Sequence, residues 1–117
     1  MNDLTTIAGI RSSIPAISGA LEGLADLSFS SRDGYLAWRT AWRECLLLSI
    51  QAVRAAKHIR GDKTRDGDDR NAANHYRNVL RGEANALFDI RVSAKIITVA
   101  HHKAARISAE TPASVAA

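Results

Sequence analysis

Apolar residues recur at alternating spacings of three and four along two long stretches of the chain. This spacing places them on one face of a helix and predicts helices over residues 31–60 and 69–108. The inward row of the first helix is Trp38, Trp42, Cys45, Ser49, Ala52, Ala56 and Ile59. The inward row of the second is Ala73, Tyr76, Leu80, Glu83, Leu87, Ile90, Ala94, Ile97, His101 and Ala104.

The charged run 61–70 separates the two predicted helices and indicates a turn between them. Both rows follow a seven-residue repeat, which is typical of supercoiled helix pairs, so we expect a long antiparallel, coiled-coil-like hairpin. A reversal of the chain about Arg65 brings Trp42 near Phe88 and Leu46 near Ala84. In this register, residues 96–108 extend past the start of the first helix and need another cover.

A third apolar row lies near the N-terminus and consists of Ile7, Ile10, Ile14, Ile17, Leu21 and Leu24. Pro15 interrupts it, and Ser12 and Ser13 are good N-cap residues, so we expect two short helices near 4–11 and 14–26. A single kinked helix is the alternative. At the ends of the first long helix, Ser30 and Asp33 have the spacing of a capping box, and Gly61 is a natural C′ residue.

The last predicted helix carries a second apolar row beside the first, formed by Phe88, Val92, Ile96 and Val99. We expect the N-terminal helical segment to pack at the base of the hairpin and cover this row. A homodimer seam through the same four residues is the alternative. The expected fold is therefore all-α, with one domain over residues 1–108 and a disordered tail over 109–117, where small residues and Pro112 predominate.

The composition is that of a folded chain of one domain, with 117 residues, 46% hydrophobic and 24% charged. The single cysteine, Cys45, cannot form an internal disulfide, and no apolar run approaches the roughly 20 residues that span a bilayer. The first residues do not show the charged-then-apolar pattern of a leader peptide, so we expect a cytoplasmic protein that does not enter a membrane. The net charge is +4, although residues 1–30 hold one basic and three acidic residues.

Candidate chemistry is sparse. The segment from Asp62 to Asp68 resembles the opening of a calcium loop, but Ala73 stands where the bidentate Glu belongs. The four histidines fall at opposite ends of the hairpin, so we expect neither a metal nor a cofactor.

Glu83 interrupts an apolar row, and we expect an ion pair with Arg43 or Arg39 that fixes the register. Without a second carboxylate or a nucleophile beside Glu83, we expect no enzymatic activity.

Basic residues gather toward the predicted turn and form the candidate partner-binding face. Arginine forks bind carboxylates or phosphates bidentately, so an acidic protein, a nucleoprotein complex or a nucleic-acid backbone would fit this face. Few aromatic residues are available for stacking on bases, which argues against sequence-specific recognition of single strands. The residues of the face are Arg54, Lys57, Arg60, Arg70, Arg77 and Arg81.

The runs YLAWRTAWRE, from Tyr35, and YRNVLRGEA, from Tyr76, resemble small uncharacterised helical reading frames of proteobacterial phages and mobile elements. The resemblance covers about half of the chain and carries over no functional residue. It implies a compact, non-enzymatic protein that binds a host complex, a class that includes inhibitors of bacterial defence such as anti-CRISPR proteins.

These observations lead to a ranked set of functional hypotheses. The first is an interaction protein that docks its basic face on an acidic host protein or nucleoprotein complex. The second is low-specificity binding of nucleic acid by the same face. The third is a structural module that forms homodimers.

Overall fold

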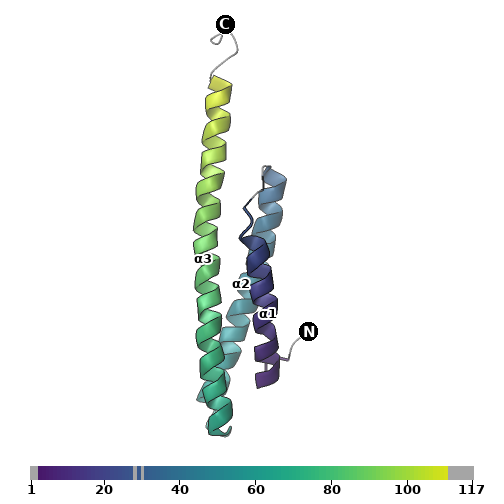
Figure 1. Ribbon diagram of the computed structural model, residues 1–117, viewed down its shortest axis with the longest axis vertical. Coiled ribbons are helices and arrows are strands. Elements are labelled where there is room, and N and C mark those ends of the chain that lie inside the picture. The colour runs from purple at the N-terminus through teal and green to yellow at the C-terminus, as the bar shows by residue number, and fades with distance from the viewer. Residues whose placement is uncertain (1–2, 28, 30, 111–117) are drawn as a thin grey trace.

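The computed structural model describes residues 3–27, 29 and 31–110, with the side chains of all of these except residues 101, 102, 105 and 108–110. The chain forms three helices, α1 (Ile7–Leu24), α2 (Arg32–Gly61) and α3 (Gly67–Glu110). Figure 1 shows α2 and α3 as an antiparallel hairpin, with α1 beside both and α3 extending well past α2. The predicted all-α hairpin with a short N-terminal helix is confirmed. The disordered tail was predicted from residue 109, but residues 109 and 110 belong to α3, and the rest of that tail, 111–117, lies outside the described part of the chain.

The register of the hairpin is set by Trp42 on α2. Its indole N–H donates a hydrogen bond to the carbonyl oxygen of Leu87 on α3 at 2.7 Å, and its ring meets Phe88 edge-on with centroids 5.9 Å apart. The predicted proximity of Trp42 and Phe88 is therefore confirmed. The predicted inward row of α2 is confirmed throughout, because all its members are buried: Trp38, Trp42, Cys45, Ser49, Ala52, Ala56 and Ile59.

The inward row of α3 is buried at every seventh residue and half-buried between. Ala73, Leu80, Leu87 and Ala94 are buried, whereas Tyr76, Glu83, Ile90 and Ile97 are partly covered. At the far end of the row the prediction was wrong for Ala104, which is exposed, because α3 continues there past the end of the bundle. The side chain of His101 lies outside the described part of the structure.

The N-terminal segment is one helix, so the alternative of a single helix is correct and the two-helix prediction is wrong. Thr6 caps it by accepting a hydrogen bond from the backbone N–H of Gly9 at 3.0 Å, and Pro15 lies inside it. Ile10, Ile17 and Leu24 are buried at seven-residue spacing. A proline interrupts the backbone hydrogen bonds of a helix, and here the buried apolar face holds the two halves of α1 in one continuous element.

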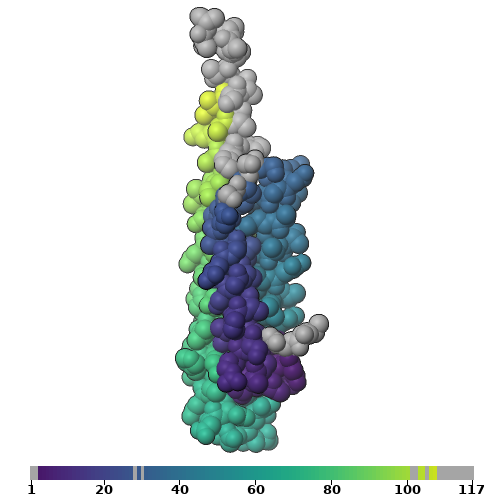
Figure 2. All heavy atoms as spheres, turned by 45° about the vertical axis from the view of Figure 1, so that its right-hand side comes forward, coloured from purple at the N-terminus to yellow at the C-terminus, as the bar shows by residue number. Residues whose placement is uncertain are grey.

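Helix α1 runs from the hairpin turn to the hairpin base. At its start, Thr5 O accepts a hydrogen bond from Arg65 Nη2 in the turn at 2.8 Å, and at its end Leu24 O accepts one from Trp38 Nε1 at 2.9 Å. Helix α1 therefore lies antiparallel to α2 and parallel to α3, as Figures 1 and 2 show. We expected the whole N-terminal segment to pack at the base of the hairpin, near the start of α2, but only the C-terminal end of α1 reaches it.

The predicted cover of the second apolar row is contradicted by the structure. Phe88, Val92, Ile96 and Val99 remain 49, 60, 64 and 59% exposed. The reason is geometric. Helix α1 packs against the inward rows of α2 and α3, and a helix of 18 residues cannot also reach the outer face of α3. Within the described residues, no helix is long and apolar enough to cross a bilayer.

The helix ends differ from two predicted caps. Ser31, not Ser30, is the N-cap of α2, and its hydroxyl accepts from Gly34 N at 3.0 Å, while Ser30 lies outside the described residues. Gly61 is the last residue of α2 rather than a C′ residue, and Asp62 follows in an extended conformation. No residue in the described part of the chain has a positive φ, so the turn does not need a glycine there.

Candidate partner-binding groove

A groove of about 310 Å³ lies between α2 and α3 and brings four of the six predicted basic residues together. On α3, Leu80 and Leu87 form the centre of the buried face. Glu83 lies on one side of this face and contacts α1, whereas Ala84 lies on the opposite side and lines the groove. The groove therefore opens on the side of the hairpin away from α1. Its lining residues are Ile50, Val53, Arg54, Lys57, Arg77, Arg81, Ala84 and Asn85.

The groove has an apolar floor and a cationic rim. Ile50, Val53 and Ala84 are half-buried and come from both helices. Arg54, Lys57 and Arg81 are exposed around them and extend long flexible side chains into solvent. A ligand in this groove can bury apolar surface and neutralise positive charge at the same time.

Arg77 is the most constrained cation of the groove. Its Nε is shielded from solvent and no acceptor within the described residues reaches it. Burial lowers the pKa of Arg77, and repulsion from the neighbouring Arg60 and Arg81 lowers it further. The charge of Arg77, held beside Arg60 and Arg81, adds to the positive potential of the groove, which favours a carboxylate or phosphate there.

The remaining two predicted cations hold the end of the hairpin together. Arg70 Nε donates to the carbonyl oxygen of Arg60 at 2.9 Å, which satisfies a carbonyl in the last turn of α2. Arg60 Nη1 donates to Asn74 Oδ1 on α3 at 3.3 Å. Arg70 therefore has a structural contact of its own, and Arg60 contributes its charge beside Arg77 while bridging the two helices.

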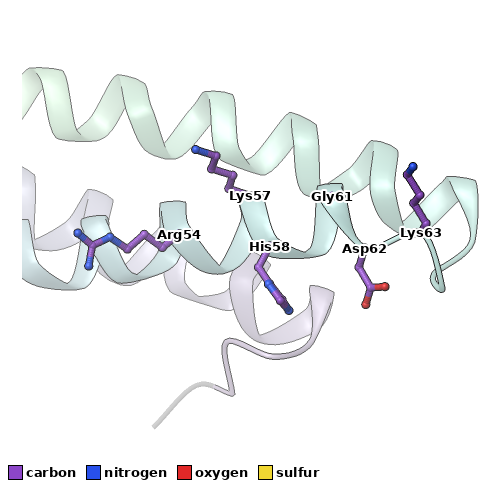
Figure 3. Close-up of a pocket in the computed structure, with 6 residues that line it drawn as sticks. All are labelled: Arg54, Lys57, His58, Gly61, Asp62 and Lys63. Atoms are coloured by element: carbon purple, nitrogen blue, oxygen red, sulfur yellow. The ribbon is translucent and has the colours of Figure 1, made fainter.

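A second, shallower hollow of about 660 Å³ continues from the groove toward the turn. It shares Arg54 and Lys57 with the groove and adds His58, Gly61, Asp62 and Lys63. In Figure 3, Lys57 and Lys63 point to the side of α3, whereas His58 and Asp62 point the opposite way. The cations of this hollow therefore extend the positive rim of the groove along α2.

Glu83 does not form the expected ion pair with Arg43 or Arg39. Its carboxylate accepts a hydrogen bond from Ser18 Oγ on α1 at 3.1 Å and lies near the buried thiol of Cys45. Burial raises the pKa of Cys45, and the charge of Glu83 raises it further. The prediction that Glu83 fixes the register of the hairpin is wrong, because the position faces α1 and helps to place that helix instead.

The turn that resembles a calcium loop uses its carboxylates for local capping. Asp62 Oδ1 accepts from the backbone and the hydroxyl of Thr64, and Asp66 Oδ1 accepts from the backbone N–H of Asp69 at 2.8 Å. Arg65 adds ion pairs to Asp62 and Asp69 at 3.7 and 3.8 Å. Across the described ranges, no three His, Cys, Asp or Glu side chains converge as metal ligands would.

Sequence reasoning identified the cations of the groove and missed its apolar floor. The available signal was modest: Val53 and Ala84 each lie next to an inward-row residue, at positions that are also apolar when the buried face of a helix is wide.

Comparisons of this chain with protein-family models, with curated proteins and with solved structures found no match.

Proposed function

We propose that this protein is a non-enzymatic binding protein that docks the α2–α3 groove on an acidic surface of a partner protein or nucleoprotein complex. The observation that supports this proposal is the convergence of Arg54, Lys57, Arg77 and Arg81 around one groove with an apolar floor. Arginine side chains bind carboxylates bidentately, and apolar surface beside them adds affinity that charge alone does not provide.

An acidic protein fits this groove better than a nucleic-acid backbone does. Phosphate contacts require cations and hydrogen-bond donors but make no use of apolar surface such as Ile50 and Val53. Among the described residues, no aromatic side chain lines the groove to stack on bases. Low-specificity nucleic-acid binding by the same cations is therefore the competing hypothesis for the experiment below.

The biological setting that we propose follows from the resemblance of the chain to small reading frames of phages and mobile elements. In that setting the acidic partner would belong to a host complex, and the protein would act as an inhibitor of bacterial defence of the anti-CRISPR kind. Occupying a surface of such a complex requires a stable shape and a complementary face, and needs no catalytic group.

Charge reversal in the groove tests the proposal. We would titrate fluorescently labelled polyglutamate, double-stranded DNA and single-stranded RNA with the protein at several salt concentrations. The variant Arg77→Glu/Arg81→Glu should bind polyglutamate more than tenfold more weakly, because each arginine–carboxylate contact contributes about 1.5 to 3 kcal/mol. The matched control is Arg11→Glu/Arg32→Glu, which makes the same charge change at exposed positions on α1 and at the start of α2.

Three results of this titration are informative. Weaker binding by the groove variant than by the control variant supports the proposal. Equal affinity of the two variants contradicts it, because the net charge would then matter and the groove would not. Tight nucleic-acid binding with a steep salt dependence, and no binding of polyglutamate, would replace it with the nucleic-acid hypothesis.

A further inference from the structure

The outer face of α3 carries an apolar stripe, formed by Phe88, Val92, Ile96 and Val99, that continues from the α2–α3 groove. Phe88 follows the groove residue Ala84 by four positions and therefore lies directly next to it along the helix surface. At the other end, Val99 lines a hollow of about 370 Å³ with Thr98, Lys103 and Arg106. The groove and the stripe together form one long apolar surface along α3.

The stripe has the spacing of a helix-packing seam. Phe88, Val92 and Val99 are separated by four and seven positions, and the buried row of Leu80, Leu87 and Ala94 shows the same seven-residue repeat on the inner face. One of the two seams on α3 is filled by α1 and α2. On the other seam, Phe88 is half-covered by the edge of Trp42, and Val92, Ile96 and Val99 are mostly exposed within the described residues. This seam occupies the position that a fourth helix would take in a bundle.

A second copy of this chain does not suit the stripe. The residues flanking it include Arg91, Lys95 and Lys103 but only one acid, Asp89. Pairing two such faces would bring the flanking cations of both copies together along the rims of the seam, where like charges repel. The cations instead complement an occupant whose flanks are acidic.

We infer that the stripe and the groove together receive one amphipathic helix of the partner, with an apolar seam and acidic flanks, lying along α3 as the fourth helix of the bundle. This inference rests on the proposed function and names the chemistry of the partner. Its seam contacts Val92 and Ile96, and its acidic flank reaches Arg77 and Arg81. The span from Arg77 to Lys103 corresponds to about 39 Å of helix, so about 26 residues of the partner are engaged.

Synthetic peptides test the inference without knowledge of the natural partner. The first probe is a 28-residue peptide with Leu at the a and d positions of a heptad and Glu at the e and g positions. The second contains the same residues in scrambled order, and polyglutamate is the third. Binding is measured by anisotropy of the labelled peptides. We expect the ordered peptide to bind at least tenfold more tightly than the scrambled one.

Removing apolar surface from the stripe distinguishes this inference from the proposed function. The variant Val92→Ser/Ile96→Ser should bind the ordered peptide at least tenfold more weakly and polyglutamate equally well. The matched control is Leu36→Ser/Leu47→Ser, which removes two exposed apolar residues, 40 and 57% exposed, from α2. Far-UV circular dichroism should show the same helicity for both variants, because all four side chains are exposed in the folded protein.

Several outcomes would overturn the inference. If the ordered and scrambled peptides bind alike while the Arg77→Glu/Arg81→Glu variant still loses polyglutamate, the stripe has no part in binding and the proposed function survives. If the groove variant also binds as its control does, both fail. Sedimentation of a dimer that Val92→Ser/Ile96→Ser dissociates would assign the stripe to a second copy. Binding to vesicles of anionic phospholipid that the same variant abolishes would assign it to a membrane surface.

Discussion

The indole nitrogen of Trp42 donates a hydrogen bond to the carbonyl oxygen of Leu87 across the hairpin, at 2.7 Å. Arg91, one helical turn beyond Leu87, lies over the Trp42 ring with its guanidinium carbon 4.9 Å from the ring centroid. Both contacts require one alignment of α2 against α3. The same alignment places Arg77 and Arg81 opposite Arg54 and Lys57, so this tryptophan positions the groove although it does not line it.

Replacing Trp42 by phenylalanine tests this relationship. The variant keeps an aromatic ring but loses the hydrogen bond and some buried volume, so the free energy of unfolding should fall by about 1 to 3 kcal/mol. Urea denaturation followed by circular dichroism measures it. Leu47→Ala, at an exposed position of the same helix, should change stability by no more than about 0.5 kcal/mol. An equal effect of the two substitutions would contradict the role of Trp42.

The contribution of α1 is tested by the same substitution at a buried and an exposed isoleucine. Ile17→Ala should cost about 2 to 5 kcal/mol of unfolding free energy, because Ile17 is fully buried where α1 meets α2. Ile96→Ala should have little effect, since Ile96 is 64% exposed and alanine is the better helix former. Urea denaturation of both variants measures the difference. Similar losses would mean that the stripe is covered in solution.

Pro15 is exposed inside α1 and supplies no N–H to the helix. Pro15→Ala should therefore raise the free energy of unfolding by up to about 3 kcal/mol, because it restores a helical hydrogen bond and a good helix former. Thermal denaturation is the simplest measurement, with Ser12→Ala as a control at an exposed position of the same helix. A fall in stability would show that α1 needs the proline to fit the bundle.

The turn should weaken in acid because of Asp62. The Thr64 hydroxyl donates to its carboxylate at 2.6 Å and the Thr64 backbone N–H at 3.0 Å, and these bonds lower the pKa of Asp62. Its stabilising contribution is therefore complete above the ordinary pKa of about 3.9 and is lost as the pH falls through the lower folded value.

Comparison of the wild type with Asp62→Asn in urea at several pH values measures this contribution. The stability difference should be largest near neutral pH and should shrink below about pH 4. Thr64→Ala, which removes the strongest donor, should show a smaller pH dependence than the wild type. A difference that is independent of pH would contradict the role of the ionised carboxylate.

Helix periodicity predicted most of the hairpin. Each inward residue of α2 from Trp38 to Ile59 could be identified because a seven-residue apolar repeat has only one face to bury. The cations of the groove could be identified for a similar reason: residues such as Arg77 and Arg81 share a face once the helix is known. Periodicity could not identify the groove itself, because its apolar floor of Ile50, Val53 and Ala84 exists only where two helices meet.

The amino-acid sequence by itself determined the two long helices, the register of the hairpin and the concentration of positive charge near its turn, whereas it favoured two short N-terminal helices over the single α1 that forms. The tertiary structure alone decided where α1 lies, which partner Glu83 has and which apolar row stays open. The physical reason is that apolar spacing specifies which face of a helix leaves water but not which neighbour covers it. Helix α3 carries two apolar rows, an inner one that faces α2 and an outer one, and the spacing of apolar residues on α1 is compatible with packing on either. In the structure α1 packs on the inner row beside α2, where Ile10, Ile17 and Leu24 become buried.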